Sequence, residues 1–157
     1  MSRLIRFLTV ALIVNCVAFG QTTQSSLTTW EAKYFRYLLR SLGNPDYSPG
    51  FRADLEGRVT ADFAMTTGET AALDNAVQSY RTFLVSARQA EAAVMVGKSN
   101  LTQADGSTLQ AIYLQEPATV QSLALQVLGS VRPETAARIK AAANVMSQFK
   151  IYGGNPK

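Results

Sequence analysis

The sequence contains no histidine and only one cysteine, Cys16. Without histidine, the Ser–His and Cys–His pairs of common hydrolases cannot be built, and zinc sites that use Cys/His ligands are equally excluded. The phosphate-binding patterns GxxxxGK[ST] and GxGxxG are also missing. We therefore expect a protein that is not an enzyme and has neither a cofactor nor a metal site.

Charge is scarce as well. Charged residues make up 17% of the chain and the formal net charge is +4. Two of the basic residues, Arg3 and Arg6, lie at the extreme N-terminus, so the rest of the chain is nearly neutral. This balance does not favour binding to nucleic acid.

The first twenty residues have the pattern of a secretory signal peptide. A basic start is followed by an apolar run, 8–19, and small residues occupy the positions before Gln21, at Ala18 and Gly20. We expect cleavage before Gln21 and export to the periplasm or to the outside of the cell.

Two alternatives stay open for this segment. It could be kept as a membrane anchor, although the run is short against the roughly 20 residues of a spanning helix. It could also be a lipoprotein signal, because Cys16 follows Leu12-Ile13-Val14-Asn15. Lipoprotein signals prefer a small residue before the cysteine, and Asn15 departs from that.

We expect one domain in the remaining chain, which is long enough for one hydrophobic core but not two. Residues 21–26 form a polar, disordered leader, 27–152 a helical domain, and 153–157 a loose C-terminal tail rich in glycine and proline.

The longest helical pattern runs from Thr66 to Gly97 and contains no proline. Thr66 and Glu69 have the spacing of a capping box, and Gly97 is a typical helix stop. Apolar residues recur at steps of three and four, and the opposite face carries little charge. We expect this helix to lie at the centre of a bundle.

Five shorter segments complete the prediction. We expect helices over 28–43, 48–63, 109–116, 117–129 and 133–149, with a connection over 98–108. No stretch alternates as a strand does. The sequence thus predicts an all-α fold, a single small bundle of five to six helices, mostly antiparallel.

The first helix carries a candidate binding stripe. Lys33, Arg36 and Arg40 share one face, with Trp30 and Tyr37 close by. Such a stripe could contact an anionic lipid or another envelope polyanion. Three charges on a helix are more often a solvated face, and the aromatic residues are more often core.

The stretch 117–131 contains no charged residue. It is too short to span a membrane as a helix, so it is either a core helix or a surface that meets a partner. In the second case Leu125 would point outward and contact the partner.

Glu91 is the candidate buried carboxylate, because it lies within the apolar arc of the long helix. Burial would raise its pKa and make it an acid or base. A structural ion pair is the more common role for such a residue.

The leading functional hypothesis is an exported helical protein that acts without catalysis, through surface contacts with an unidentified protein or envelope component. An alternative is a bundle that binds an apolar small molecule or lipid between its helices. Its lining would be Tyr80, Phe83, Tyr113 and Met146. A carboxylate enzyme using Glu91 is a third class, and the oligomeric state stays open.

Overall fold

The computed structural model describes residues 27–148. These residues form six helices and no strand: α1 (Thr29–Gly43), α2 (Pro49–Asp62), α3 (Thr67–Met95), α4 (Gln103–Tyr113), α5 (Gln115–Ser130) and α6 (Pro133–Gln148). The predicted all-α bundle is confirmed. The expected signal peptide with Cys16, the polar leader, the last residues of the predicted domain and the tail lie outside the described residues.

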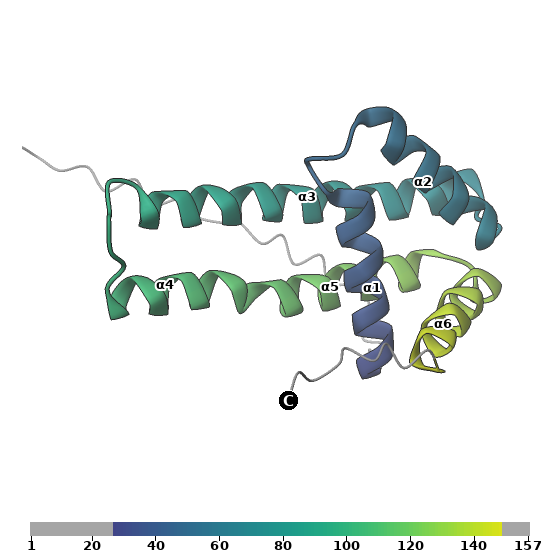
Figure 1. Cartoon of the computed structure of the whole chain (residues 1–157). Coiled ribbons are helices and arrows are strands. Elements are labelled where there is room, and N and C mark those ends of the chain that lie inside the picture. The colour runs from purple at the N-terminus through teal and green to yellow at the C-terminus, as the bar shows by residue number, and fades with distance from the viewer. Residues whose placement is uncertain (1–26, 149–157) are drawn as a thin grey trace, which may run out of the picture.

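The helices are arranged around one long antiparallel hairpin. One limb is α3, and the other is made by α4 and α5, which follow each other almost in line (Figure 1). At one end of this hairpin α1 crosses both limbs, with α2 and α6 beside it (Figure 1). The other end, where α3 turns into α4, projects away from the remaining helices.

Three helices begin with a capping box. Thr28 with Glu31 opens α1, and Thr66 with Glu69 opens α3, as the spacing predicts. In each box the threonine hydroxyl accepts the N3 backbone N–H, while the glutamate accepts the N–H of the threonine. Each pair thus satisfies two of the free donors at a helix start.

The third capping box corrects the predicted connection over 98–108. Asp105 accepts the backbone N–H of Thr102 at 2.9 Å, and the Thr102 hydroxyl accepts the N–H of Asp105. Asp105, which was read as a loop residue, is therefore an N3 capping residue. The helix α4 begins at Gln103 and includes Gly106 and Ser107.

The start of α5 also differs from the prediction. Pro117 was expected to begin this helix, but α5 begins at Gln115 and Leu114 alone separates it from α4. Pro117 lies in the first turn of α5. A helix does not use its first backbone N–H groups internally, so proline is tolerated there.

The hydrophobic core lies where α1 crosses the hairpin. Its fully buried side chains come from α1, the first half of α3, α5 and α6, together with Phe63. The uncharged stretch 117–131 is a core helix, since Val120, Leu123, Ala124 and Val127 are buried. Neither α2 nor α4 contains a buried residue. Among the described helices, none has both the length and the apolar character that crossing a membrane requires.

Candidate functional site

The most concentrated cluster of polar groups surrounds Glu116, whose side chain is only 5% exposed. Its two oxygens accept from the Arg40 Nε at 2.7 Å and Nη2 at 2.8 Å, and from the Arg36 Nη2 at 2.7 Å. The hydroxyl of the buried Tyr80 donates to the same carboxylate at 2.5 Å. Two cations and a phenol thus surround one anion.

The elements that build this cluster come from three parts of the chain. Arg36 and Arg40 are four residues apart, so they lie on one face of α1. Tyr80 comes from the middle of α3, and Glu116 from the first turn of α5. A carboxylate in the first turn of a helix is also favoured by the helix dipole. The cluster therefore joins α1 to both limbs of the hairpin.

The protonation state of the cluster is fixed at neutral pH. Burial alone would raise the pKa of Glu116, but the hydrogen bonds from Arg40, Arg36 and Tyr80 outweigh it and lower the pKa to about 2. Burial, followed by the hydrogen bond to Glu116, raises the pKa of Tyr80 to about 12. Neither group exchanges a proton easily near pH 7, so the cluster is built to hold helices together rather than to act as an acid or base.

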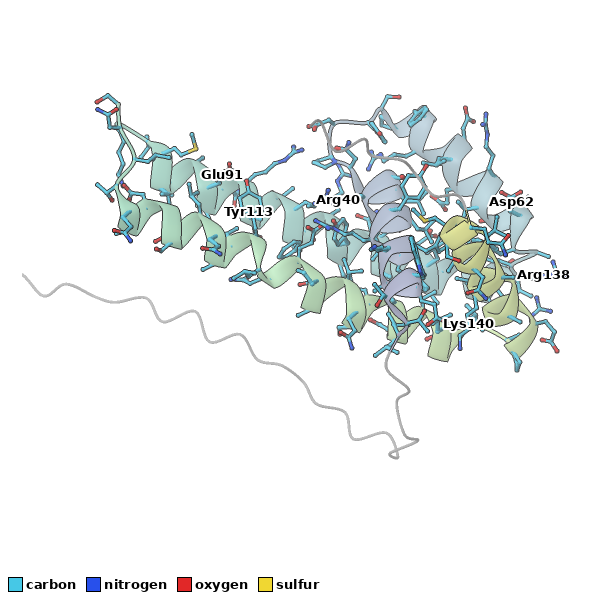
Figure 2. All side chains as sticks on the ribbon, turned by 60° about the horizontal axis from the view of Figure 1, so that its bottom comes forward. Arg40, Asp62, Glu91, Tyr113, Arg138 and Lys140 are labelled. Atoms are coloured by element: carbon cyan, nitrogen blue, oxygen red, sulfur yellow. The ribbon has the colours of Figure 1, made fainter. Side chains whose placement is uncertain are left out.

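A cavity of about 170 Å³ lies beside this cluster, and Glu91 and Tyr113 line it together with Phe83. In Figure 2, Glu91 and Tyr113 lie next to each other on facing helices, farther along the hairpin than Arg40. Hydrogen bonding to the Glu91 carboxylate raises the pKa of Tyr113. Glu91 is half-buried and not fully buried as expected, because the hairpin has no third helix over it at this point.

The predicted basic stripe on α1 is divided between two roles. Arg36 and Arg40 turn toward Glu116 and are not free for an external anion. Lys33 lies over the Trp30 ring, with its Nζ 4.4 Å from the ring centroid. Tyr37 is 62% exposed. Two of the three cations thus neutralise an internal carboxylate, which weakens the case for an anionic surface.

The other predicted contact residues are not brought together. Leu125 is half-buried on a core helix and does not form an open surface. Tyr80 is fully buried in the Glu116 cluster, while Phe83 and Tyr113 line the small cavity. Met146 belongs to α6 and does not line that cavity. The four residues of the expected apolar ligand site therefore share no common space.

A second buried carboxylate lies at the opposite end of the core. Glu69, besides capping α3, accepts the backbone N–H of Arg132 at 2.7 Å and its Nε at 3.0 Å. Arg132 also donates to the carbonyl of Ala64. The side-chain bonds from Arg132, followed by those from the Thr66 backbone, lower the pKa of Glu69 well below its usual range. This pair ties the turn before α3 to the turn before α6.

Neither of these long-range pairings follows from the sequence patterns. The spacing predicts only a capping role for Glu69, and no pattern points to Glu116. One signal was present: Glu116 is the only charged residue between Asp105 and Arg132. A single carboxylate in such a long uncharged stretch has to find a partner if it is buried.

The projecting end of the hairpin carries more than half of the exposed large hydrophobic residues of the described chain. We call residues 81–114 the arm and the remaining described residues the body. Six of the eleven exposed large hydrophobic residues of the described chain lie in the arm: Val85, Met95, Val96, Leu101, Tyr113 and Leu114. Val96 and Leu114 are 75% and 67% exposed.

The inner and outer faces of the arm differ. Leu84, Ala87 and Val94 form the half-buried row of α3, which faces α4. Val85 lies about 150° around the helix from the middle of this row, on the side turned away from α4. Val96 follows the last turn of α3 and is 75% exposed. The arm therefore has apolar side chains that its own second helix leaves uncovered.

Comparison with models of protein families, with curated proteins and with solved structures finds no match to this chain.

Proposed function

We propose that this chain is exported and acts without catalysis, through surface contacts made by the arm. The observation that carries the proposal is the uncovered apolar surface of residues 81–114. Large exposed apolar surface on a small protein is typical of an interaction site. The body has a core of its own, so folding alone does not explain why the hairpin extends beyond it.

Three of the five charged residues of the arm are in ion pairs within the described chain, and the other two, Arg81 and Glu91, line cavities. Arg88 pairs with Asp46 of the α1–α2 loop at 2.8 Å, and Lys98 pairs with Asp105. Glu91 lines the inner cavity beside Tyr113. The outward surface of the arm is thus left without a dominant charge, which fits an apolar partner better than a polyanion.

The occupant that best fits this surface is the arm of a second copy of this chain. Two identical faces without a dominant charge meet with little like-charge repulsion, and a two-fold axis closes such a pair as a dimer. Two helical hairpins packed side by side give a four-helix bundle, which supplies the core that one hairpin lacks. Such a contact about 20 Å long and two helices wide buries roughly 1,000 Å² in total, near the lower limit for a specific interface.

Sedimentation velocity over a concentration series tests this contact. We expect a reversible monomer–dimer equilibrium with a dissociation constant on the order of micromolar, since the interface is small. Val96→Lys and Leu114→Lys each place two like charges at the contact and should weaken the dimer at least tenfold. Both side chains are exposed, so the fold should survive, as circular dichroism would verify.

The matched control is Val145→Lys, because Val145 is an exposed valine of α6, outside the arm. It should leave the dimer unchanged. A protein that stays monomeric at several hundred micromolar contradicts the proposal. A dimer that resists both arm substitutions places the contact elsewhere and contradicts it equally.

Export is tested separately by the intact mass of the protein isolated from cells, envelope and medium. We expect the mass of Gln21–Lys157 in the exported fraction. An acylated species that begins at Cys16 would make the chain a lipoprotein and contradict cleavage before Gln21. An uncleaved chain in the cytoplasm would contradict export.

A further inference from the structure

A larger cavity, of about 290 Å³, lies between α2 and α3 at the end of α1. It is separate from the Glu116 cluster, and of the arm it includes only the first residue, Arg81. Its lining is mixed: Leu42, Pro49, Ala53 and Val77 are apolar, and Gln78 and the charged residues Arg52, Glu56, Asp74 and Arg81 are polar. Ligand pockets typically combine apolar walls with a few convergent polar groups.

The four charged residues of this cavity share an unusual property. All four are half-buried, yet none takes part in an ion pair among the described residues. The Arg52 Nε atom is shielded from solvent and has no hydrogen-bond partner in this part of the chain. The same protein gives its buried Glu69 and Glu116 several donors each. Buried polar groups are normally paired, so the Arg52 Nε is a donor that lacks its usual partner in this part of the chain.

The two carboxyl groups lie against each other. Burial first, and then hydrogen bonding to Asp74, raises the pKa of Glu56. Two carboxylates at one site repel each other, so ionising both of them is costly. Without a ligand, the cavity thus carries two guanidinium groups and two neighbouring carboxyl groups. An ammonium group between the two carboxyl groups relieves this repulsion.

We propose that this cavity binds a small zwitterion, with its ammonium between Glu56 and Asp74 and its carboxylate on Arg52 and Arg81. A guanidinium group binds a carboxylate through two parallel hydrogen bonds, which suits the arginine side. The cavity volume is near the lower end for ligand sites, which begin at about 300 Å³. The ligand class is therefore of amino-acid size.

The position of the site suggests what binding does to the fold. Arg52 and Glu56 belong to α2, which has no buried residue of its own, whereas Asp74 and Arg81 belong to α3. A zwitterion in the cavity bridges the two helices. Binding should therefore fix α2 to α3 and slow amide exchange in α2.

Isothermal titration calorimetry on the purified protein tests the proposal. The probes are unbranched amino acids from glycine to aminohexanoate, which differ in the distance between ammonium and carboxylate. We expect at least one of them to bind with one site per chain. The alkylamine and the carboxylate of the same length should bind at least tenfold more weakly.

Variants separate the two halves of the site. Asp74→Asn and Arg81→Gln should each weaken the best probe at least tenfold. The matched controls Asp54→Asn and Arg58→Gln change exposed residues of α2 that do not line the cavity, and they should bind as the natural protein does. Asp74→Asn removes a like-charge contact and should not unfold the chain.

Three results would overturn the proposal. The first is that no member of the series binds at millimolar concentration. The second is that dicarboxylates bind as tightly as the amino acids, which would make the cavity a simple anion site. The third is that both cavity variants retain the affinity. None of these results bears on the arm, whose dimer is measured separately.

Discussion

At the level of single residues, Glu116 is the most consequential side chain of the body. Replacing it by glutamine removes the charge of a buried group that accepts four hydrogen bonds from three side chains. Hydrogen bonds to charged groups contribute about 1.5–3 kcal/mol, and the partly exposed arginines recover some hydration. We expect Glu116→Gln to lower the free energy of unfolding by about 2 kcal/mol, as measured by urea denaturation.

Glu134→Gln is the control, because Glu134 is exposed in the first turn of α6 and accepts no side-chain hydrogen bond among the described residues. It should change stability by less than about 0.5 kcal/mol. Equal stability of the natural protein and Glu116→Gln would show that the cluster does not hold the three helices together.

The effect of Glu116 should depend on pH. Its pKa is about 2 in the folded protein against an ordinary value of 4.5, so the folded state favours the ionised form. This contribution is fully present above a pH of about 4.5 and disappears as the pH falls toward 2. The difference in unfolding free energy between the natural protein and Glu116→Gln should therefore narrow across this range. If the difference in unfolding free energy stays constant from pH 4.5 down to pH 2, the folded-state pKa of Glu116 is not lowered.

Three glutamates, Glu69, Glu91 and Glu116, show how much of a single residue's surroundings the sequence predicts. The capping role of Glu69 depends only on Thr66, three residues away, and the prediction of that role is confirmed. The partners of Glu116 are 36 to 80 residues away, so no local pattern contains them. Glu91 was expected to be buried because its helix is apolar around it, but its exposure depends on which helices cover that turn.

At the level of elements, two glycines offer a matched test. A Cβ on Gly43 would lie 3.1 Å from a ring carbon of Tyr80, which is held in place by Glu116. A Cβ on Gly57, within α2, would meet nothing within 4 Å. Alanine is favoured over glycine inside a helix by up to about 1 kcal/mol.

We therefore expect opposite signs from the same substitution. Gly57→Ala should raise the unfolding free energy by about 0.5–1 kcal/mol, while Gly43→Ala should lower it by about 1–3 kcal/mol through overpacking. Chemical denaturation of both variants measures this. If Gly43→Ala stabilises the protein, the Tyr80 ring is able to move aside. That result would contradict a Tyr80 held in place by Glu116.

Helix boundaries were predictable where a local signal fixes them and not elsewhere. The starts of α1, α2 and α3 are predictable because each N-cap residue and the residues it contacts lie within four consecutive positions. The start of α4 was missed because Asp105, Gly106 and Ser107 read as a loop by composition, although Thr102 and Asp105 form a capping box. In the sequence, Phe51, Leu55, Val59 and Phe63 recur at steps of four and share one face of α2. Phe51 is nevertheless 52% exposed, because packing depends on helices that are remote in sequence.

At the level of the whole molecule, the chain divides into a body with a core and an arm without one. The all-α class follows from periodicity alone, but this division does not. The long helix α3 has the same pattern throughout, while its fully buried residues end at Tyr80. The half of α3 that is buried is the half that α1 crosses, near Tyr80. This crossing depends on contacts between helices that are remote in sequence, so the pattern within α3 does not contain it.

This division predicts two levels of stability within one chain. The fully buried side chains of α3 lie in its first half, and α4 has none, so the arm can open without disturbing the core. Segments with few buried apolar contacts exchange their amide hydrogens through local opening, while core helices exchange only through global unfolding. In dilute solution, amides of α4 should therefore exchange much faster than those of α5.

Amide exchange also tests the proposed contact between two arms. Raising the protein concentration through the dimerisation range should slow exchange in residues 81–114, because a second arm covers their apolar face, and should leave α5 unchanged. Leu114→Lys should remove this concentration dependence without altering exchange in the body. If α4 is as slow as α5 in the monomer, the arm is stable by itself, and its exposed apolar residues need no partner to explain them.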